Sequence, residues 1–286
     1  MTENFVDAGP VRLWTERSGD PGRPAVLLIT GSAAQGFTWP DAMVGRLLER
    51  GAQVIRYDHR DTGLSSVVDY DRHPYGLAEM AADAVAVLDA YDLPSAHIAG
   101  ASMGGMIGQW LAVHEPARVR TLTLFSSTPM GYDPGPLWRG EATDPGSLPP
   151  PAKRFLRYLE DSEDLTPGVE SDMALFRVMN GDVLPFDEAE ARTVLERCWA
   201  RAVDPSAAAH HQEAGQRMTP DRFAPLSAIT APTVVVYGDQ DPIYTPEHAE
   251  ALVAAIPGAQ LRLVPGMGHV YFSPGLPEQL ADLIPL

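Results

Sequence analysis

The sequence is poor in cysteine and contains no long apolar run. Cys198 is the single cysteine, so no disulfide bond can form within the chain. The apolar runs are of strand length, well short of the roughly 20 residues that cross a bilayer. The first residues, MTENFVDAGP, have neither the basic start nor the apolar stretch of a secretory signal. These absences predict a cytoplasmic protein without a membrane partner.

Basic residues are also scarce. The chain of 286 residues has 21 Lys and Arg against 38 Asp and Glu, a net charge of −17. That charge repels nucleic-acid backbones, so we expect no nucleic-acid partner and interpret the acidic surface as an aid to solubility. The phosphate-loop, dinucleotide-binding and H-E-x-x-H zinc motifs are absent as well. We therefore expect neither a nucleotide cofactor nor a bound metal.

Strand-like and helix-like patterns alternate over most of the chain. A hairpin is predicted within Phe5–Arg17, and buried strands are predicted for AVLLIT, QVIRYD, SAHIAG, VRTLTLFSS, PTVVVYGD and AQLRLVP. Helices are predicted for WPDAMVGRLLERG, GLAEMAADAVAVLDAYDL, MGGMIGQWLAVHEP, PEHAEALVAAIPG and the C-terminal residues. This alternation predicts an α/β fold, with a mainly parallel sheet and helices on both of its faces.

The alternation stops between about Pro129 and Pro225. This stretch is rich in proline and holds short helical patterns such as AKRFLRYLED, ESDMALFRVMNG and EAEARTVLERCWARA. We predict a helical insertion over 129–225 within an α/β core formed by 1–128 and 226–286. Because open α/β sheets bind ligands at the carboxyl ends of their strands, we expect the insertion to cover a site there as a lid.

Ser102 stands in Gly100-Ala101-Ser102-Met103-Gly104, a G-x-S-x-G sequence between a predicted strand and a predicted helix. In this setting the serine sits on a sharp turn that exposes its hydroxyl, and the glycines are needed because two backbones pass close together. A purely structural glycine-rich turn is the alternative. We predict that Ser102 is a nucleophile, which needs a histidine base and an acid that orients the base.

The base and the acid are predicted from loops that follow the last strands. His269 lies in GMGHVY after AQLRLVP, near the chain end. The other histidines lack such a setting; they are His59, His73, His97, His114, His210, His211 and His248. Of the two aspartates that follow PTVVVYG, we prefer Asp241 as the acid because it lies further out along the loop, and we expect Asp239 to cap the turn through its own backbone. The order serine, acid, histidine is the one expected with this type of serine turn.

An acyl-transfer intermediate needs backbone N–H donors for its oxyanion. We predict one donor from Met103, directly after the nucleophile, and another from Ser32 in the loop GSAAQGF, for which a purely structural role is the alternative. We predict that the substrate site is lined by Gly31 of the same loop and by four side chains of the insertion, namely Trp138, Phe176, Met179 and Phe186. Most other apolar side chains of the insertion are expected to form its own core.

Two further patterns are interpreted as structural. YDHRDTGLSS is predicted to form a hydrogen-bonded turn near the site, with its charged residues paired with one another. Cys198 is expected to be a small buried apolar residue rather than a second nucleophile.

The order of elements, the G-x-S-x-G turn, YDHRDTGLS, the helical insertion, GDQDPI and PGMGH together resemble the α/β-hydrolase superfamily across nearly the whole chain. Within it, VIRYDHRDTG, HPYG, AADAVAVLD, SMG and IPGMGH resemble the aclacinomycin methylesterase-like enzymes of polyketide antibiotic pathways. Those enzymes remove a methyl group from an ester on an anthracycline ring. The resemblance implies the α/β-hydrolase fold, with a mostly parallel eight-stranded sheet flanked by helices and a helical cap insertion.

The family's serine, aspartate and histidine fall on Ser102, Asp241 and His269, and its oxyanion donors fall on Ser32 and Met103. One departure is that Thr30 precedes Gly31 where His-Gly is common, which removes a frequent supporting histidine from the oxyanion loop. The resemblance implies a cofactor-free serine hydrolase whose partner is a small ester, such as the methyl ester of an aromatic polyketide. A carbon–carbon bond hydrolase, a cofactor-free perhydrolase and a non-hydrolytic ligand-binding protein are alternatives on the same scaffold.

Overall fold

The sheet has eight strands in the residues that the computed structural model describes, 1–132, 148–162, 165–217 and 225–286. The strands are β1 (Thr2–Ala8), β2 (Val11–Ser18), β3 (Ala25–Ile29), β4 (Gln53–Tyr57), β5 (Ala96–Ala101), β6 (Val119–Phe125), β7 (Thr233–Gly238) and β8 (Gln260–Val264). Their order is β1-β2-β4-β3-β5-β6-β7-β8. Strand β2 is antiparallel to β1 and β4, and all other neighbours are parallel. The predicted mostly parallel sheet is therefore confirmed.

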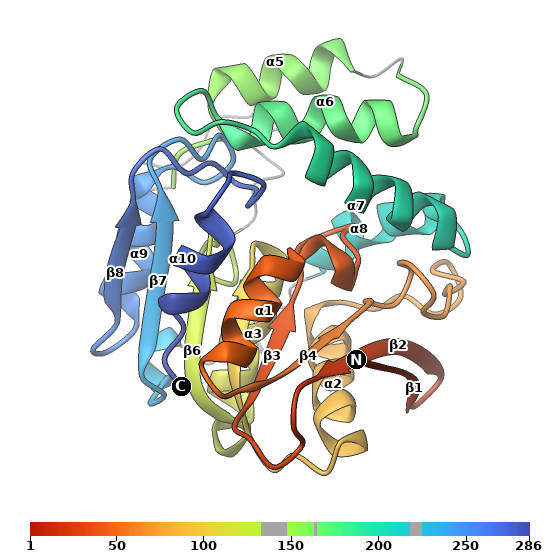
Figure 1. The fold of residues 1–286 in the computed structure, drawn as a ribbon, viewed down its shortest axis with the longest axis vertical. Coiled ribbons are helices and arrows are strands. Elements are labelled where there is room, and N and C mark those ends of the chain that lie inside the picture. The colour runs from red at the N-terminus through yellow and green to blue at the C-terminus, as the bar shows by residue number, and fades with distance from the viewer. Residues whose placement is uncertain (133–147, 163–164, 218–224) are drawn as a thin grey trace.

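Helices cover both faces of this sheet (Figure 1). They are α1 (Asp41–Glu49), α2 (Leu77–Ala90), α3 (Met103–His114), α9 (Pro246–Ala255) and α10 (Leu276–Asp282). Helices α1 and α10 pack on one face, whereas α2, α3 and α9 pack on the other (Figure 1). Short 3-10 helices occupy Gly36–Thr38 (η1), Pro116–Arg118 (η2), Pro205–Ala209 (η3) and Leu226–Ala228 (η5). Helix α3 ends just before Pro116, which cannot continue a helical hydrogen-bond ladder.

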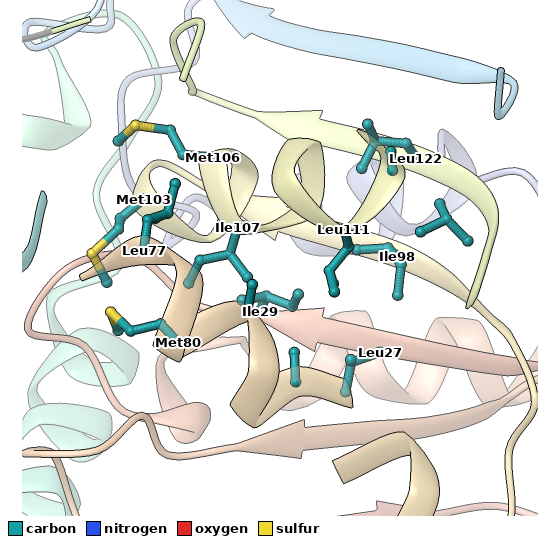
Figure 2. Close-up of a cluster of buried hydrophobic side chains, with 14 of the residues drawn as sticks. Leu27, Ile29, Leu77, Met80, Ile98, Met103, Met106, Ile107, Leu111 and Leu122 are labelled. Carbon is teal, nitrogen blue, oxygen red and sulfur yellow. The ribbon is translucent and has the colours of Figure 1, made fainter. Parts of the chain in front are cut away.

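An apolar core on the face of α2 and α3 supports the turn that carries Ser102. Figure 2 shows side chains of α2, α3, β3, β5 and β6 in contact, among them Leu27, Ile29, Leu77, Met80, Ile98, Ile107, Leu111 and Leu122. These side chains are almost completely buried. Burying each one stabilises the fold by about 1.5–3 kcal/mol relative to exposure. The core therefore holds the start of α3 firmly against the carboxyl ends of β3 and β5.

The described part of the insertion between β6 and β7 contains four α-helices. They are α5 (Lys153–Asp161), α6 (Val169–Asn180), α7 (Glu188–Arg201) and α8 (His210–Gln216). In Figure 1 they lie together across one end of the sheet. Helices α5, α6 and α7 share an apolar cluster with Val270 and Phe272, which follow β8. The insertion therefore packs at the carboxyl end of the parallel strands, and the predicted helical insertion is confirmed.

Candidate active site

Ser102 occupies the turn between β5 and α3, with a φ of 52° and a ψ of −119°. A non-glycine residue in such a conformation costs about 1–3 kcal/mol, so surrounding contacts must hold it. The Ser102 N–H donates to the Phe125 carbonyl (2.9 Å), and the Ser102 carbonyl accepts from the Ser127 hydroxyl (2.8 Å). The backbones pass so close that a Cβ on Gly100 would lie 2.2 Å from the Gly104 carbonyl oxygen. The glycines permit the turn, and the turn presents the Ser102 side chain.

Asp241 and His269 lie in the loops after β7 and β8, and their side chains are hydrogen bonded. His269 Nδ1 is 2.8 Å from Asp241 Oδ2, and the Asp241 side chain is fully buried. The other carboxylate oxygen accepts from the N–H groups of Ile243 (2.9 Å) and Tyr244 (3.0 Å). Because a carboxylate only accepts, Nδ1 carries a proton, which leaves Nε2 of a neutral His269 as the basic nitrogen.

Tyr244, which was not predicted from the sequence, contacts both Ser102 and His269. Its ring centroid lies 5.7 Å from that of His269 and 5.1 Å from that of His248. Burial raises the pKa of Tyr244, and a hydrogen bond with the Ser102 side chain acts in the opposite direction. Through these contacts, Ser102 and the Asp241–His269 pair belong to one site. The signal that could have found Tyr244 is its position three residues after the predicted acid, in the same loop.

Asp239 contacts a different partner from the one predicted. Instead of capping its own turn, its Oδ1 accepts from the N–H of Gly266 at 2.7 Å, in the loop after β8. Asp239 and Gly266 are close in space because β7 and β8 are parallel neighbours, so the loops at the carboxyl ends of these strands lie side by side. Asp239 thus ties the two loops together, while Asp241 is the carboxylate that contacts His269.

The predicted oxyanion donors lie next to the nucleophile. Met103 is the first residue of α3, where N–H groups have no carbonyl partner within the helix. A Cβ on Gly31 would lie 3.3 Å from the Cβ of Ser102 and 3.9 Å from its Oγ, so the loop after β3 runs against the serine. Ser32 follows Gly31 directly. The structure thus places Gly31 and Met103 beside Ser102, and Ser32 is the next residue of the loop after Gly31.

The insertion residues that were predicted to line the substrate site lie in two settings. Met179 is buried, and its backbone carbonyl accepts a hydrogen bond from the backbone N–H of His269 at 2.6 Å. Met179 therefore borders the site directly. Phe176 stacks on Phe272 at 5.5 Å between centroids, and Phe186 is half-buried in the same apolar cluster. Trp138 lies outside the described residues.

The charged residues of Tyr57–Gly63 do not pair with one another, so that prediction was wrong. Their partners are Arg201 for Asp58 (2.6 Å), Asp83 for Arg60 (2.7 Å) and His210 for Asp61 (3.0 Å). The segment leaves β4 at the carboxyl end of the sheet, where α7 and α8 pack against it. The carbonyl of Gly63 also accepts from the Val203 N–H at 2.9 Å. Tyr57–Gly63 is therefore one part of the core onto which the second half of the insertion docks.

Cys198 is buried beside Trp14 and Phe37, as predicted, and burial raises the pKa of its thiol to about 12. A thiol of that pKa stays protonated near neutral pH and is a poor nucleophile.

Within the described ranges, no group of three or more His, Cys, Asp or Glu side chains is arranged to hold a metal ion. In that same part of the chain, no helix combines the length and the apolar character needed to cross a membrane.

Known proteins match the chain over almost its whole length. The α/β hydrolase fold family matches residues 24–275, and the protein belongs to this family. Within it, the chain is 38% identical to the rhodomycin D methylesterase DnrP of Streptomyces peucetius, over 94% of this chain and 92% of that protein. It is also 38% identical to the rhodomycin D methylesterase DauP of Streptomyces sp. strain C5, over the same shares of both chains.

Solved structures share the fold at lower sequence identity. A hydrolase from Pseudomonas aeruginosa PA01 is 24% identical with a TM-score of 0.73, covering 99% of this chain and 96% of that one. The esterase EaEST from Exiguobacterium antarcticum is 20% identical with a TM-score of 0.74, covering 98% and 97%. These likenesses show that the overall fold is shared.

Proposed function

We propose that the protein is a serine hydrolase that cleaves a carboxylic ester, and that this ester is the methyl ester of an aromatic polyketide or a similar apolar metabolite. The observation that carries the proposal is the hydrogen bond between His269 and Asp241 next to Ser102, with Tyr244 contacting both sides. The substrate class is supported by two relatives that are 38% identical and are named rhodomycin D methylesterases. The chain covers 92% of the length of each.

The proposed mechanism follows from the chemistry of these groups. Ser102 Oγ attacks the ester carbonyl while His269 Nε2 takes its proton, and Asp241 holds the imidazole in the required tautomer. The oxyanion accepts hydrogen bonds from the N–H groups of Ser32 and Met103. The alcohol, methanol for a methyl ester, leaves with the proton from His269. A water molecule that His269 activates then cleaves the acyl-enzyme and releases the acid, so the cycle needs no cofactor.

We further propose that 129–225 acts as a lid on a core made of 1–128 and 226–286. Two contacts support this division, because the insertion touches both loops that flank Ser102. Met179 bonds to the backbone of His269, and His211 bonds to the loop after β3. In this arrangement, Met179 and Gly31 border the reacting centre. Phe176 and Phe186 supply the apolar side of the substrate site.

An active-site probe tests the hydrolase. The wild-type protein should react with a fluorophosphonate, and Ser102→Ala should not. The exposed Ser227 offers a matched control, so Ser227→Ala should label like the wild type. If the wild-type protein bound an ester tightly but neither labelled nor turned it over, it would be a ligand-binding protein rather than a hydrolase.

A substrate panel tests the ester class. Aromatic polyketide methyl esters and simple acyl esters are incubated with the protein, and methanol and free acid are followed by mass spectrometry. We expect methanol and acid in equal amounts from the polyketide esters, with no release by Ser102→Ala. Labelling by the probe without methanol release from any methyl ester would contradict the methyl-ester substrate and retain the serine hydrolase.

A further inference from the structure

His211 of helix α8 makes two hydrogen bonds to backbone groups of the core. Its Nδ1 is 2.9 Å from the N–H of Ala33, and its Nε2 is 2.7 Å from the carbonyl oxygen of Arg60. Because a backbone N–H only donates and a carbonyl only accepts, Nδ1 must be unprotonated and Nε2 must carry the hydrogen. His211 is 1% exposed, and its bond to Arg60 is buried, whereas its bond to the exposed residue Ala33 is partly buried. His211 therefore works as a neutral imidazole in one fixed tautomer.

Ala33 is the residue directly after the proposed oxyanion donor Ser32, and it has a φ of 59°. An L-residue in this left-handed region is destabilised by about 1–2 kcal/mol, so the turn needs a contact that holds it. The hydrogen bond from Ala33 to His211 provides that contact. The peptide that carries the Ala33 N–H directly follows the peptide that carries the Ser32 N–H, so a contact that fixes Ala33 also limits the freedom of the proposed oxyanion donor.

A second buried imidazole holds the other end of the same loop. His59 Nε2 is 3.0 Å from the carbonyl oxygen of Thr30, to which it must donate. The rings of His59 and His211 meet edge to face, 5.6 Å apart. Position 30, where a histidine is common, is Thr30 in this chain. Two histidines from other segments instead bond to the loop on either side of Gly31 and Ser32.

Resting on the proposed function, we propose that His59 and His211 are positioning residues that jointly orient the oxyanion loop, so that the helical insertion helps to build the catalytic site. Neither imidazole acts on the substrate. His59 fixes the loop through Thr30, and His211 fixes it through Ala33. Because His211 belongs to α8, the Ser32 N–H is aimed correctly only while the second half of the insertion is docked on Tyr57–Gly63.

Asparagine and glutamine separate the two hydrogen bonds of His211, and at His59 they distinguish the ring position that donates to Thr30 from the other one. The side-chain amide of Asn reaches the place of Nδ1, and that of Gln reaches the place of Nε2. His211→Asn can therefore keep the acceptor for Ala33, whereas His211→Gln keeps only the donor to Arg60. At His59 the preference is reversed, because His59→Gln keeps the donor to Thr30 and His59→Asn loses it.

The test measures ester hydrolysis, the rate of Ser102 phosphonylation by a fluorophosphonate, and the thermal unfolding midpoint of the four variants. We expect His211→Gln and His59→Asn to lower kcat and the phosphonylation rate by about 10- to 100-fold, since a displaced oxyanion donor weakens transition-state binding. KM should change by no more than about twofold, because the ground-state ester does not depend on the oxyanion donors. His211→Asn and His59→Gln should stay within about fivefold of wild-type kcat.

This reciprocal pattern distinguishes positioning from simple packing. If both substitutions at a position lower kcat equally, or if kcat follows only the unfolding midpoint, the proposal is wrong. Should one variant at His211 fail to fold, the opposite preference at His59 decides the question. A wild-type protein that neither hydrolyses esters nor reacts with the probe refutes the proposed function itself. Normal wild-type activity with an unimpaired His211→Gln refutes the positioning role alone.

Discussion

Asp241 and His269 are hydrogen bonded through Oδ2 and Nδ1 at 2.8 Å, although 28 positions separate them in the chain. The nearby Asp239 instead accepts a hydrogen bond from the N–H of Gly266, so Asp241 is the aspartate that bonds to the imidazole. Asp239 and Asp241 therefore have different hydrogen-bond partners. Substituting each one separately measures the role of each.

Asp241→Asn should lower kcat by about 10³- to 10⁴-fold, because an amide can donate to Nδ1 and favour the wrong imidazole tautomer. The matched control is Asp239→Asn, whose amide oxygen still accepts from Gly266, so kcat should stay within about threefold. Steady-state kinetics with the best ester of the panel gives both values. Equal losses in the two variants would contradict the assignment of Asp241 as the acid.

Gly268→Ala should destabilise the loop that carries His269. Its Cβ would lie 2.2 Å from the Met179 carbonyl oxygen and 2.3 Å from that of Asn180, both backbone atoms of the insertion. We expect a loss of about 2–3 kcal/mol in the free energy of unfolding and reduced kcat. Gly45→Ala is the control, since nothing lies within 4 Å of its Cβ in α1, and it should stabilise by about 0.5–1 kcal/mol. Urea unfolding measures both, and an unaffected Gly268→Ala would show that the insertion does not press on the His269 loop.

Arg201→Met should destabilise the docking of the insertion. Arg201 bonds to the fully buried Asp58 at 2.6 Å and to Gln35 Oε1 at 2.7 Å, and its loss would leave a buried carboxylate without its cation. We expect a cost of about 3 kcal/mol. The exposed pair Arg192–Glu170 is the control, and Arg192→Met should change stability by about 0.5 kcal/mol or less. Similar unfolding midpoints for both variants would contradict a stabilising role for the Asp58–Arg201 pair.

The buried histidines predict that the protein loses stability in acid. Burial and the proximity of His211 lower the pKa of His59 to about 3, whereas the unfolded chain has the ordinary value of about 6.5. Between these values the unfolded state binds a proton that the folded state refuses, so the free energy of unfolding falls as pH decreases, by about 1.4 kcal/mol per pH unit from this group. Above pH 6.5 the contribution of His59 is constant.

The comparison of wild type with His59→Gln isolates this contribution, because Gln keeps the donor to Thr30 and does not titrate. Urea unfolding at several pH values from 4 to 8 should give parallel stability curves above pH 7. Below pH 6 the free energy of unfolding should fall more steeply with decreasing pH in the wild type than in His59→Gln. Curves that stay parallel down to pH 4 would mean that His59 is not held neutral in the folded state.

Most of the fold was predictable from the sequence because its signals are local. Strand-length apolar runs, helical spacing and the stop at Pro116 reflect hydrogen bonding and burial among residues close in the chain. The G-x-S-x-G turn at Ser102 is partly of the same kind. A Cβ on Gly100 would meet the carbonyl group of Gly104, which is close in the chain, whereas a Cβ on Gly104 would meet the carbonyl oxygens of Ile29 and Thr30 at the end of β3. The order of Ser102, Asp241 and His269 indicated a site because each follows a parallel strand, and parallel strands end at the same edge.

The contacts that complete the site were decided by the tertiary structure alone. Asp58 pairs with Arg201 across 143 positions, and Ala33 bonds to His211 across 178. Neither pair has a local signal, because each depends on where α7 and α8 come to lie against the core. For the same reason the charges of Tyr57–Gly63 were wrongly expected to pair internally. The periodicity of a sequence indicates which side of a helix or strand is buried. The hydrogen-bond partner of a buried polar group is determined only when distant elements pack together, because that packing decides which donor or acceptor lies within hydrogen-bond distance.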